Sequence, residues 1–544
     1  MFYGSGLTII ILFQNYSIDM QSSTESGEEY IVKINPATLE EFGKVKCNTA
    51  DDVSIALQNA RNAQYEWMKK SYNDKAVIMN NIQESIISNI DDIARTICGE
   101  TGKPKSEAIS TDIFAALAAG EYANSKMSEL FKRENINLED MQFPMKLAGR
   151  SSYIAPRPVG IVAVISPWNY PFGIPYSQTI MAIAAGNAVI IKPSSDTPLT
   201  ALKMLEIMKK GGLPDNLVQV LVGPGRTVGD AILTSDVDRI VFTGSGDVGR
   251  RVMSQASQRL TPVTLELGGK DPMVILKDAD LERASSAAVW GSFVNSGQTC
   301  VCVKRIYVDE SIFDQFLEMF KNKTLMLKQG WGWEDQSISL GSLINEKALQ
   351  EMEMHVKKAV EEGARILTGG KKTPNLDGYY FEPTILVDTP QNSSAVQDEI
   401  FGPIVTVMKF SSEDEVIKLA NDCKYALSGS VWTSNIVKGK VIAELISSGT
   451  VVVNNLLYTY GLAATPWGGN GESGFGRTHG KFGFEELTEP HHIHVDKGKY
   501  AEDPWWFPYS KEKSESLENF MYSFYSQDGS PIKSLLQLHK MMKK

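Results

Sequence analysis

The spacing of apolar residues along the chain predicts two kinds of element. From Arg61 to Ile109 the pattern is helical, because isoleucines recur at every fourth position on one face. From about residue 160, short apolar runs follow one another at intervals of 22 to 29 residues, with helical stretches between them. These runs are Gly160–Ser166, Ala188–Lys192, Leu217–Val222, Arg239–Thr243 and Pro262–Leu267. This cadence predicts βαβ units, and therefore a parallel sheet covered by helices.

A second series of the same kind begins at Pro272 and ends at Asn455. Its predicted strands are Arg305–Val308, Ile404–Phe410, Ser428–Thr433 and Thr450–Asn454. Its predicted helices are Ile312–Leu327, Glu346–Glu362 and Ser412–Asn421. Because 544 residues are too many for one compact core, we predict an α/β protein with two parallel-sheet domains. The first domain would comprise residues 30–140 and 158–266, and the second residues 267–465.

Composition and charge narrow the classes of partner. The chain has a net charge of −11 and an isoelectric point near 5.3, so we predict no nucleic-acid partner. Its five cysteines are scattered and odd in number, which favours a reducing compartment and a cytoplasmic location over a disulfide framework. Cys300 and Cys302 stand too close together for a standard zinc pair, and the six histidines supply no matching ligands. We therefore predict no metal site.

The N-terminal segment, residues 1–29, differs from the rest of the chain. Its apolar run Leu7–Phe13 is far shorter than the roughly 20 residues that span a bilayer. No positive side chain precedes Lys33, so a secretory signal is not expected either. We interpret this segment as a disordered extension or as a translation-start artefact upstream of Met20.

The C-terminal extension, residues 497–544, is rich in aromatic side chains and ends in basic ones. Its aromatic residues include Trp505, Trp506, Phe507, Tyr509, Phe520, Tyr522, Phe524 and Tyr525. Two interpretations are open. The rings dock on the protein's own surface or at a subunit interface, or they form a lid or a peripheral membrane contact near a hydrophobic substrate.

The segment from Asn295 to Cys300 offers a candidate nucleophile. A thiol reacts as its thiolate, and it needs a proton acceptor or a positive neighbour at neutral pH. Cys300 lies in a polar turn between a predicted helix and a predicted strand, and Glu266 precedes it by 34 residues. We take Cys300 and Glu266 as a candidate nucleophile and base. A single cysteine is otherwise interpreted as a small buried hydrophobic residue.

A glycine pattern after the run Arg239–Thr243 indicates a dinucleotide site. Gly244, Gly246 and Gly249 match G-x-G-x-x-G at the start of a predicted helix, where backbone N–H groups approach a pyrophosphate. The pattern makes the first domain a Rossmann-like dinucleotide-binding domain. It would also assign the ribose to Glu266, which conflicts with a role as base. The conflict is resolved if Lys192, at the end of the second strand, binds the ribose rather than being a solvated strand-end charge.

Several separate motifs occur in a fixed order along the chain. They are Asn35-Pro36-Ala37-Thr38, Pro167-Trp168-Asn169-Tyr170-Pro171, Ile191-Lys192-Pro193-Ser194, Phe242-Thr243-Gly244-Ser245, Leu265-Glu266-Leu267-Gly268-Gly269-Lys270, Gly297-Gln298-Thr299-Cys300, Glu399-Ile400-Phe401-Gly402-Pro403 and Pro466-Trp467-Gly468-Gly469. Together they resemble the NAD(P)-dependent aldehyde dehydrogenase superfamily over about residues 30 to 495.

The resemblance implies a mechanism and a set of catalytic residues. The Cys300 thiolate would attack an aldehyde, and the Asn169 amide with the Cys300 N–H would hold the oxyanion. Hydride transfer to the nicotinamide would leave a thioester, which a water activated by Glu266 would hydrolyse to a carboxylic acid. Members that transfer the acyl group to coenzyme A generally lack this base, so hydrolysis is expected. Asn169 alone is otherwise a turn residue before Pro171.

The resemblance also implies the cofactor-binding residues, for NAD or NADP. Lys192 would bind the adenosine ribose and Glu399 the nicotinamide ribose. Gly244 and Ser245 would face the pyrophosphate, and Trp168 would flank the cofactor and substrate cleft. Gly249 and Phe401 are the remaining candidate cofactor-binding residues. Ser195 stands where many NAD-preferring members carry Glu, so NADP should be tolerated and even preferred. Gln178 replaces a lysine that assists proton transfer in some members.

The substrate and the assembly follow less directly from the resemblance. The segment Leu456–Leu462 matches the family's substrate loop, and it is apolar and aromatic like Trp467, Tyr170 and Val294, which favours a hydrophobic aldehyde over ordinary core packing. A semialdehyde dehydrogenase, a non-catalytic binding or structural protein and a thioester hydrolase that pairs Cys300 with a histidine are the alternatives. Residues 141–157 and 480–496 would form a small β oligomerisation domain in a homodimer or homotetramer.

Overall fold

The computed structural model describes residues 22–25, 28–136, 150–498, 501–530, 532–534 and 536–537. The chain divides into two compact units, with divisions after Ser125, Pro158 and Leu487. The larger unit contains both parallel sheets. The smaller unit comprises residues 126–158 and 488–544, which include a small antiparallel sheet and the C-terminal extension. The predictions for residues 1–21, and for residues 141–149 of the first oligomerisation strand, lie outside the described residues.

The first domain is a six-stranded sheet with the order β20-β10-β9-β6-β7-β8. Its strands are β6 (Ile161–Ile165), β7 (Ala188–Lys192), β8 (Val218–Val220), β9 (Arg239–Thr243), β10 (Val263–Glu266) and β20 (Gly474–Phe475). All neighbours are parallel except β10 and β20. The strand order reverses between β6 and β9, and such a switch point is where open α/β sheets bind ligands.

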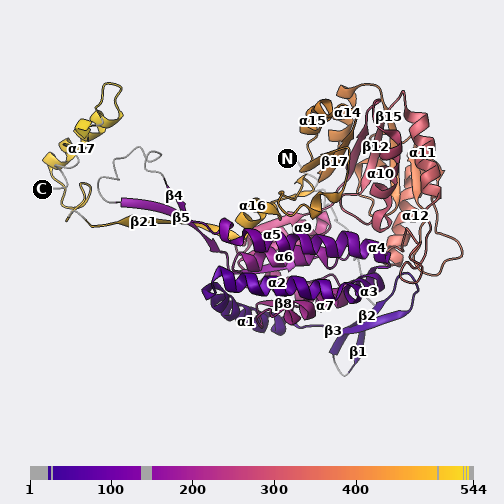
Figure 1. The fold of residues 1–544 in the computed structure, drawn as a ribbon, viewed down its shortest axis with the longest axis horizontal. Coiled ribbons are helices and arrows are strands. Elements are labelled where there is room, and N and C mark those ends of the chain that lie inside the picture. Colours follow the sequence, from indigo (N-terminus) through magenta and orange to yellow (C-terminus); the bar gives the residue numbers. More distant parts are fainter. Residues whose placement is uncertain are drawn as a thin grey trace, which may run out of the picture. The chain divides into compact units, whose positions relative to one another are not determined.

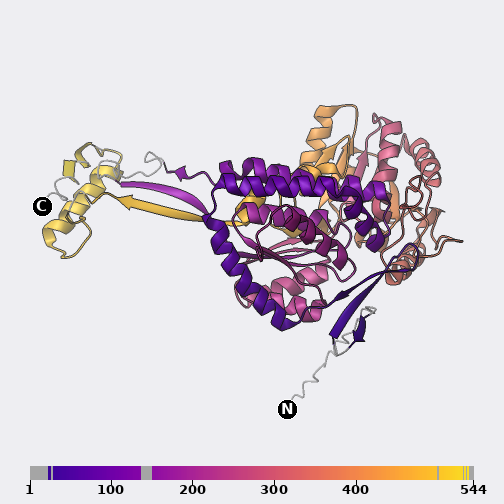
Figure 2. The same ribbon diagram turned by 60° about the horizontal axis from the view of Figure 1, so that its bottom comes forward.

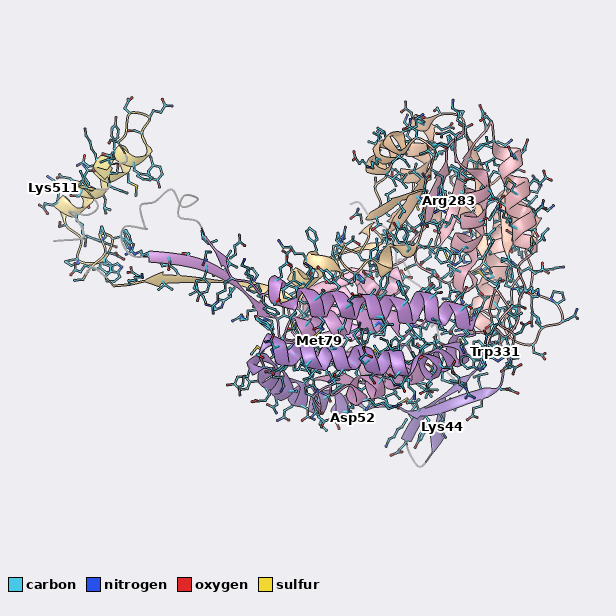
Figure 3. All side chains as sticks on the ribbon, in the orientation of Figure 1. Lys44, Asp52, Met79, Arg283, Trp331 and Lys511 are labelled. Atoms are coloured by element: carbon cyan, nitrogen blue, oxygen red, sulfur yellow. The ribbon has the colours of Figure 1, made fainter. Side chains whose placement is uncertain are left out.

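Helices cover both faces of this sheet, as Figure 2 shows. They are α1 (Ala50–Lys69), α2 (Tyr72–Ser88), α3 (Ile90–Thr101), α4 (Lys105–Glu107), the π-helix η1 (Ala108–Ile113), α5 (Phe114–Leu130), α6 (Gly173–Ala184), α7 (Pro198–Lys210), the π-helical turn η3 (Gly225–Gly229), α8 (Asp230–Leu233) and α9 (Gly246–Ser257). A capping box starts α1, since the Thr49 hydroxyl accepts from Asp52 N and the Asp52 carboxylate accepts from Thr49 N. Met79, labelled on α2 in Figure 3, is fully buried in this helical layer.

The second domain is a seven-stranded sheet with the order β13-β14-β15-β12-β11-β17-β18. Its strands are β11 (Asp271–Ile275), β12 (Val303–Asp309), β13 (Arg365–Thr368), β14 (Thr384–Val387), β15 (Ile404–Phe410), β17 (Ser428–Trp432) and β18 (Thr450–Val453). Its helical elements are α10 (Leu281–Phe293), the 3-10 turn η4 (Val294–Gly297), α11 (Phe313–Leu325), α12 (Glu346–Glu361), α13 (Ser394–Gln397), α14 (Glu413–Asn421), α15 (Ile436–Leu445) and η5 (Tyr458–Gly461). Only β13 runs antiparallel to its neighbour in this sheet.

Alternate side chains of the central strand β11 serve two separate cores. Met273 and Ile275 lie in the core formed with α10 and α11, whereas Val274, and Leu276 just after the strand, lie in the core formed with α14 and α15. Because successive side chains of a strand point to opposite faces, such a strand is apolar throughout. Figure 1 shows these helices around the strands β12, β15 and β17. The predicted fold class, with two parallel-sheet domains, is confirmed.

Short strands complete the larger unit. β1 (Ser22–Glu25), β2 (Glu28–Ile34) and β3 (Glu41–Lys46) form an antiparallel sheet, drawn in indigo in Figure 1. β1 and the start of β2 fall within residues 1–29, where we expected a disordered extension, and the pairing of Ser22 with Ile31 orders this part. β16 (Tyr425–Ala426) pairs with β19 (Asn470–Gly471). In the described part of the chain, no helix is both long and apolar enough to cross a membrane.

The smaller unit contains a three-stranded antiparallel sheet with the order β21-β5-β4. Its elements are β4 (Glu134–Asn135), β5 (Arg150–Pro158), β21 (Thr488–Asp496) and the helix α17 (Lys511–Tyr525). The predicted second oligomerisation strand, residues 480–496, begins too early. Residues Gly480–Glu486 form the helix α16 in the larger unit, because Phe484 is buried there and Gly483 packs too closely on Thr478 for a side chain.

Candidate active site

The loop that carries Cys300 has an unusual backbone. Asn295 and Ser296, between α10 and Cys300, both have φ of 54°, in the left-handed region that side chains disfavour. Gly297 follows with φ of 72°, and a Cβ there would collide with the carbonyl of Gly402. Strain of this kind persists only where surrounding contacts fix the conformation, and it is concentrated at functional sites.

Hydrogen bonds with buried and half-buried side chains hold this loop. The Gln298 amide nitrogen donates to the carbonyl oxygen of Asn295 at 3.0 Å, and its Oε1 accepts from Ile344 N at 2.9 Å. The Ser296 hydroxyl donates to the carbonyl of Gly341 at 2.7 Å. The Glu107 carboxylate accepts from Asn295 N at 3.1 Å. The loop is therefore clamped in place by side chains.

The thiol of Cys300 is not activated by its own surroundings. Burial raises its pKa well above the usual value, and the nearby carboxylates of Glu266 and Asp271 raise it further. Attack on a carbonyl therefore requires a proton acceptor or an added positive charge at the site. Glu266 is the acceptor that lines the same cavity as Cys300.

Glu266 is the last residue of β10 and is 4% exposed. Its Oε1 accepts a hydrogen bond from the Thr478 hydroxyl at 2.8 Å. Burial raises its pKa to about 7, against hydrogen bonds from Thr478 and Trp467 and the charge of Arg477, which lower it. A carboxyl group that titrates near neutral pH is suited to take a proton from water and to release it again.

Asn169 follows β6 and lies next to the loop of Cys300. Its amide nitrogen donates to the carbonyl oxygen of Gln298 at 3.1 Å, and its Oδ1 has no partner among the described residues. An amide nitrogen carries two hydrogens, so one remains to meet an oxyanion. Its backbone carbonyl accepts from Lys103 Nζ at 2.7 Å and from Asn295 Nδ2 at 3.1 Å.

A buried ion pair supports Asn169, and we did not predict it from the sequence. Lys103 Nζ lies 3.2 Å from Asp112 Oδ2, and both side chains are fully buried. The ammonium group also lies 4.2 Å from the ring centroid of Tyr170. Asp112 Oδ1 accepts from the backbone N–H groups of Phe172 and Gly173 at the start of α6. The pair thus fixes the turn that carries Asn169.

One cavity, of about 200 Å³, joins the predicted nucleophile and the predicted base. Its lining residues are Ser110, Thr111, Phe114, Ala115, Tyr170, Ile174, Glu266, Trp290, Val294, Thr299, Cys300, Val301, Leu457, Tyr458, Tyr460, Gly461 and Trp467. Six of these side chains are aromatic, and none is basic. The π-helix η1 supplies Ser110 and Thr111, and π-helical turns are frequent at functional sites. Four residues of the predicted substrate loop, Leu457, Tyr458, Tyr460 and Gly461, also line the cavity.

The glycine pattern lies at the start of α9 with the geometry of a phosphate site. Ser245 is the N-cap residue of α9, and its side chain makes no capping hydrogen bond, so the first N–H groups of the helix keep their donor capacity. A side chain at Gly249 would collide with Leu267, so glycine allows helix and strand to pack closely. Gly244 N already donates to the carbonyl of Glu266 at 3.0 Å. The residues present therefore fit a dinucleotide.

Lys192 ends β7 and has donors to spare. It is 7% exposed, its Nζ donates to the carbonyl of Pro193 at 2.9 Å, and burial lowers its pKa to about 8. An ammonium group has three hydrogens, so this buried cation suits ribose hydroxyl groups. Ser195, close by, has its hydroxyl 3.5 Å from the carbonyl of Gly223.

The predicted nicotinamide end of the site is built from both domains. Glu399 accepts a hydrogen bond from Gly269 N at 3.3 Å, and any side chain at Gly268 would collide with its carboxylate. Burial raises the pKa of Glu399, while Lys270 and Lys304 oppose the rise. Trp168, after β6, meets the ring of Phe401 edge to face at 5.4 Å.

The structure thus brings Cys300, Glu266 and Asn169 together. Of the predicted cofactor residues, those around Trp168, Lys192 and Gly244 follow the ends of β6, β7 and β9, whereas Glu399 and Phe401 lie in the loop before β15. Gln178, predicted as the replacement for a lysine, is buried and donates to the Thr243 hydroxyl at 3.0 Å. Five residues of the site were not predicted from the sequence: Lys103, Asp112, Glu107, Thr478 and His479. Two signals in the sequence could have indicated them. One is a lysine and acids within an apolar helical segment, and the other is a histidine that follows the Trp467 motif.

Comparisons with known proteins give one family. The chain matches the sequence profile described as "Aldehyde dehydrogenase family" over residues 22–493. It is 36% identical to a betaine aldehyde dehydrogenase of Bacillus subtilis, covering 88% of this chain and 97% of that protein. It is 34% identical to a 4,4'-diapolycopene aldehyde oxidase of Methylomonas, covering 87% of each. A solved Mycobacterium tuberculosis aldehyde dehydrogenase complexed with NAD+ superposes with a TM-score of 0.81, 32% identity and coverage of 86% of this chain and 94% of that chain.

Proposed function

This chain belongs to the aldehyde dehydrogenase family, and we propose that it oxidises a hydrophobic aldehyde to the free carboxylic acid with NAD(P) as hydride acceptor. The observation that carries the proposal is that Cys300 and Glu266 line one apolar cavity. A nucleophile that forms a thioester and a base that activates water must both reach the same carbon atom. The cavity gives them that common position.

The steps assigned to this chain's own residues follow from the contacts. Glu266, with a pKa of about 7, accepts the thiol proton, and Cys300 Sγ then bonds to the carbonyl carbon. The Asn169 amide and the Cys300 N–H hold the oxygen as it gains charge. NAD(P), when bound, supplies the acceptor for the hydride. Glu266 then passes the thiol proton to solvent and, ionised again, takes a proton from water. The water oxygen attacks the thioester, the C–S bond breaks, the sulfur regains a proton, and the acid leaves.

Each part of the cofactor can be assigned to residues of this chain. Lys192 would bind the adenosine ribose, the N-terminus of α9 the pyrophosphate and Glu399 the nicotinamide ribose. Trp168 and Phe401 would border the ring. The donor capacity of Ser245 and Lys192 and the close approach at Gly249 support this assignment.

The cavity supports a substrate with an aromatic or short aliphatic body. A cavity of about 150 Å³ lined by apolar side chains already accommodates benzene. The volume here, about 200 Å³, therefore has room for one ring with its aldehyde group. A semialdehyde that carries a carboxylate is the alternative, but none of the described residues that line the cavity is basic. An unpaired carboxylate would be costly to bury there.

A panel of aldehydes tests the proposal. We expect the purified protein to form reduced cofactor with benzaldehyde and hexanal, and to release free acid without needing coenzyme A. Succinic semialdehyde should have a kcat/KM at least tenfold lower. Cys300→Ser should abolish the reaction. Formation of an acyl-CoA product, or unchanged turnover by Cys300→Ser, would contradict the proposal.

We also propose a homo-oligomer in which the sheet of the smaller unit continues across subunits. β21 is an edge strand of nine residues in that sheet, and long edge strands invite pairing with another chain. Light scattering during gel filtration should give a dimer or a tetramer.

A cytoplasmic location remains a prediction, supported by five cysteines that all remain unpaired thiols.

The C-terminal extension exposes several large rings, including Phe507 and Tyr522, which are 76% and 75% exposed. We propose a subunit contact for them rather than a lid. A chain truncated after Gly498 should keep its activity on long-chain aldehydes and lose assembly. Loss of activity on long chains alone would favour the lid, and binding of the full chain to lipid vesicles would favour the membrane contact.

A further inference from the structure

The base Glu266 is joined to a buried histidine by a single hydroxyl group. The Thr478 hydroxyl lies 2.8 Å from Glu266 Oε1 and 3.0 Å from His479 Nδ1. All three residues are buried, with exposed fractions of 4%, 8% and 2%. The His479 ring also meets the ring of Tyr460 edge to face at 4.7 Å, which fixes the plane of the imidazole.

The direction of these hydrogen bonds follows from the number of protons. A hydroxyl group has one hydrogen, so Thr478 can donate to only one of its two partners. A carboxylate only accepts, so Thr478 donates to Glu266 whenever Glu266 is ionised. Thr478 must then accept from His479, which places the imidazole hydrogen on Nδ1. Burial lowers the pKa of His479 to about 4, so the ring is neutral at physiological pH.

We propose that Thr478 and His479 are positioning residues for Glu266. The imidazole of His479 orients the Thr478 hydroxyl so that its proton points to Glu266, and this hydroxyl holds the Glu266 carboxylate at the cavity, where it acts as a base. The inference rests on the proposed function. It explains why two buried polar residues follow the Trp467 motif without contacting the cavity. It also explains why His479 Nε2 has no partner among the described residues, since only Nδ1 is used.

The other titratable and charged groups that face Glu266 affect its pKa less than the Thr478 hydroxyl does. The Cys300 thiol and the Tyr460 phenol are protonated at neutral pH, since burial raises the pKa of both well above the usual values. The Arg477 guanidinium lowers the pKa of Glu266 less than the hydrogen bonds from Thr478 and Trp467 do. Its own N–H groups donate to the carbonyls of Gly469 and Gly476 at 3.1 and 2.7 Å.

The test is the pH dependence of thioester hydrolysis in Thr478→Val, which removes the hydroxyl at nearly constant volume. Loss of a hydrogen bond to the ionised carboxylate should move the midpoint of the rising limb up by about one to two pH units. Turnover at pH 7 should then fall by about fivefold to fiftyfold and recover to about half of the parent's rate or more at pH 9. Thr478→Ser, which keeps the hydroxyl, should restore the parent midpoint. Hydrolysis of p-nitrophenyl acetate without cofactor gives a second readout of the same base.

The chain offers a matched control in a second buried pair. The Thr200 hydroxyl donates to Glu100 Oε2 at 2.7 Å, both residues are fully buried, and burial raises the pKa of Glu100 to about 7. This pair lies outside the cavity. Thr200→Val should therefore leave the midpoint unchanged. A Thr478→Val midpoint that coincides with the parent's, or an equal shift in Thr200→Val, would overturn the inference.

Two substitutions of His479 separate positioning from packing. His479→Phe keeps a ring against Tyr460 and removes both nitrogens, so it should shift the midpoint upward without lowering the melting temperature. His479→Asn keeps a donor near the position of Nδ1 and should restore the parent midpoint. A parent-like profile in His479→Phe would overturn the role of the imidazole. If Cys300→Ser still hydrolyses the ester, the proposed function itself fails, which is a separate outcome.

Discussion

Two groups of residues near Cys300 are held in place by different chemistry. The oxyanion wall, defined as Asn169 with Lys103 and Asp112, depends on a fully buried ion pair and backbone donors. The base wall, defined as Glu266 with Thr478 and His479, depends on a neutral hydroxyl group and a neutral imidazole. Glu266 lines the cavity with Cys300, and the Asn169 amide donates to the carbonyl of Gln298 in the loop that carries Cys300.

The difference corresponds to what each wall must do. Asn169 keeps its protons throughout the reaction, so the charge pair behind it has only to hold its orientation. Glu266 must gain and lose a proton, and a lysine in direct contact would stabilise its ionised form and make it a weaker base. A hydroxyl group stabilises the carboxylate less than a full charge does. The base wall therefore holds the carboxyl group and still lets it titrate near neutral pH.

The largest expected effect separates the two walls by the step that each serves. Glu266→Gln should lower steady-state turnover by about 10²- to 10⁴-fold, because both thiol deprotonation and hydrolysis lose their base. The first turnover should still give a burst of reduced cofactor at pH 9, where the thiol ionises more readily. Asn169→Ala should lower the rate by about 10²- to 10³-fold and abolish the burst, because the oxyanion forms first. Stopped-flow absorbance measures both quantities, and a burst in Asn169→Ala would contradict the division.

The next effect concerns stability and should be confined to the oxyanion wall. Lys103→Met leaves Asp112 buried without its cation, and breaking a buried pair costs about 3 to 5 kcal/mol. Lys105→Met, in the neighbouring exposed pair with Asp91, should cost no more than about 1 kcal/mol. Urea unfolding of the three proteins measures the difference. Equal losses of unfolding free energy in the two variants would show that the buried pair stabilises the protein no more than the exposed pair does.

The strand positions of the first sheet were predictable because each strand is a short apolar run between turn signals. The predicted run Ala188–Lys192 has the bounds of β7, and Arg239–Thr243 has those of β9. The strand β11 was missed because it begins only five residues after β10 ends, without a helix between them. β20 has two residues and depends on pairing with β10, so it has no local signal.

The site divides in the same way. Cys300, Glu266 and Asn169 lie in motifs, so the sequence identified them. Lys103 is separated by 66 residues from Asn169, and Thr478 by 212 residues from Glu266. Contacts over such separations depend on how the domains fold together, and no local periodicity records them. The residues that hold the catalytic groups were therefore found only in the structure.

A smaller effect should appear in the dependence of stability on pH. Burial raises the pKa of Glu266 and of Glu107 from 4.5 to about 7, so the folded state holds extra protons between these values. The stabilisation is complete below pH 4.5 and is lost as pH rises through 7, by roughly 3 kcal/mol per group. Unfolding free energies from pH 5 to pH 8 should fall less steeply in Glu266→Gln and in Glu107→Gln.

Glu107→Gln is also a control for the base wall. Glu107 holds the backbone of Asn295, and its amide replacement keeps an acceptor oxygen there. The variant should therefore change the stability profile and leave the midpoint for hydrolysis where it is. A shift of that midpoint would mean that Glu107, and not Glu266 alone, sets the pH dependence of the base.

The smallest expected effect concerns the choice between NAD and NADP at the adenosine ribose, and it should leave the oxyanion wall and the base wall unchanged. Ser195 stands near Lys192, and it presents no charge to a 2′-phosphate. Ser195→Glu would repel that phosphate and accept from ribose hydroxyl groups, so the ratio of kcat/KM for NADP to that for NAD should fall about tenfold or more, which corresponds to about 1.4 kcal/mol. The burst amplitude and the midpoint for hydrolysis should match the parent's, because Ser195 contacts neither wall. If the parent already excludes NADP, a residue other than Ser195 sets the selectivity.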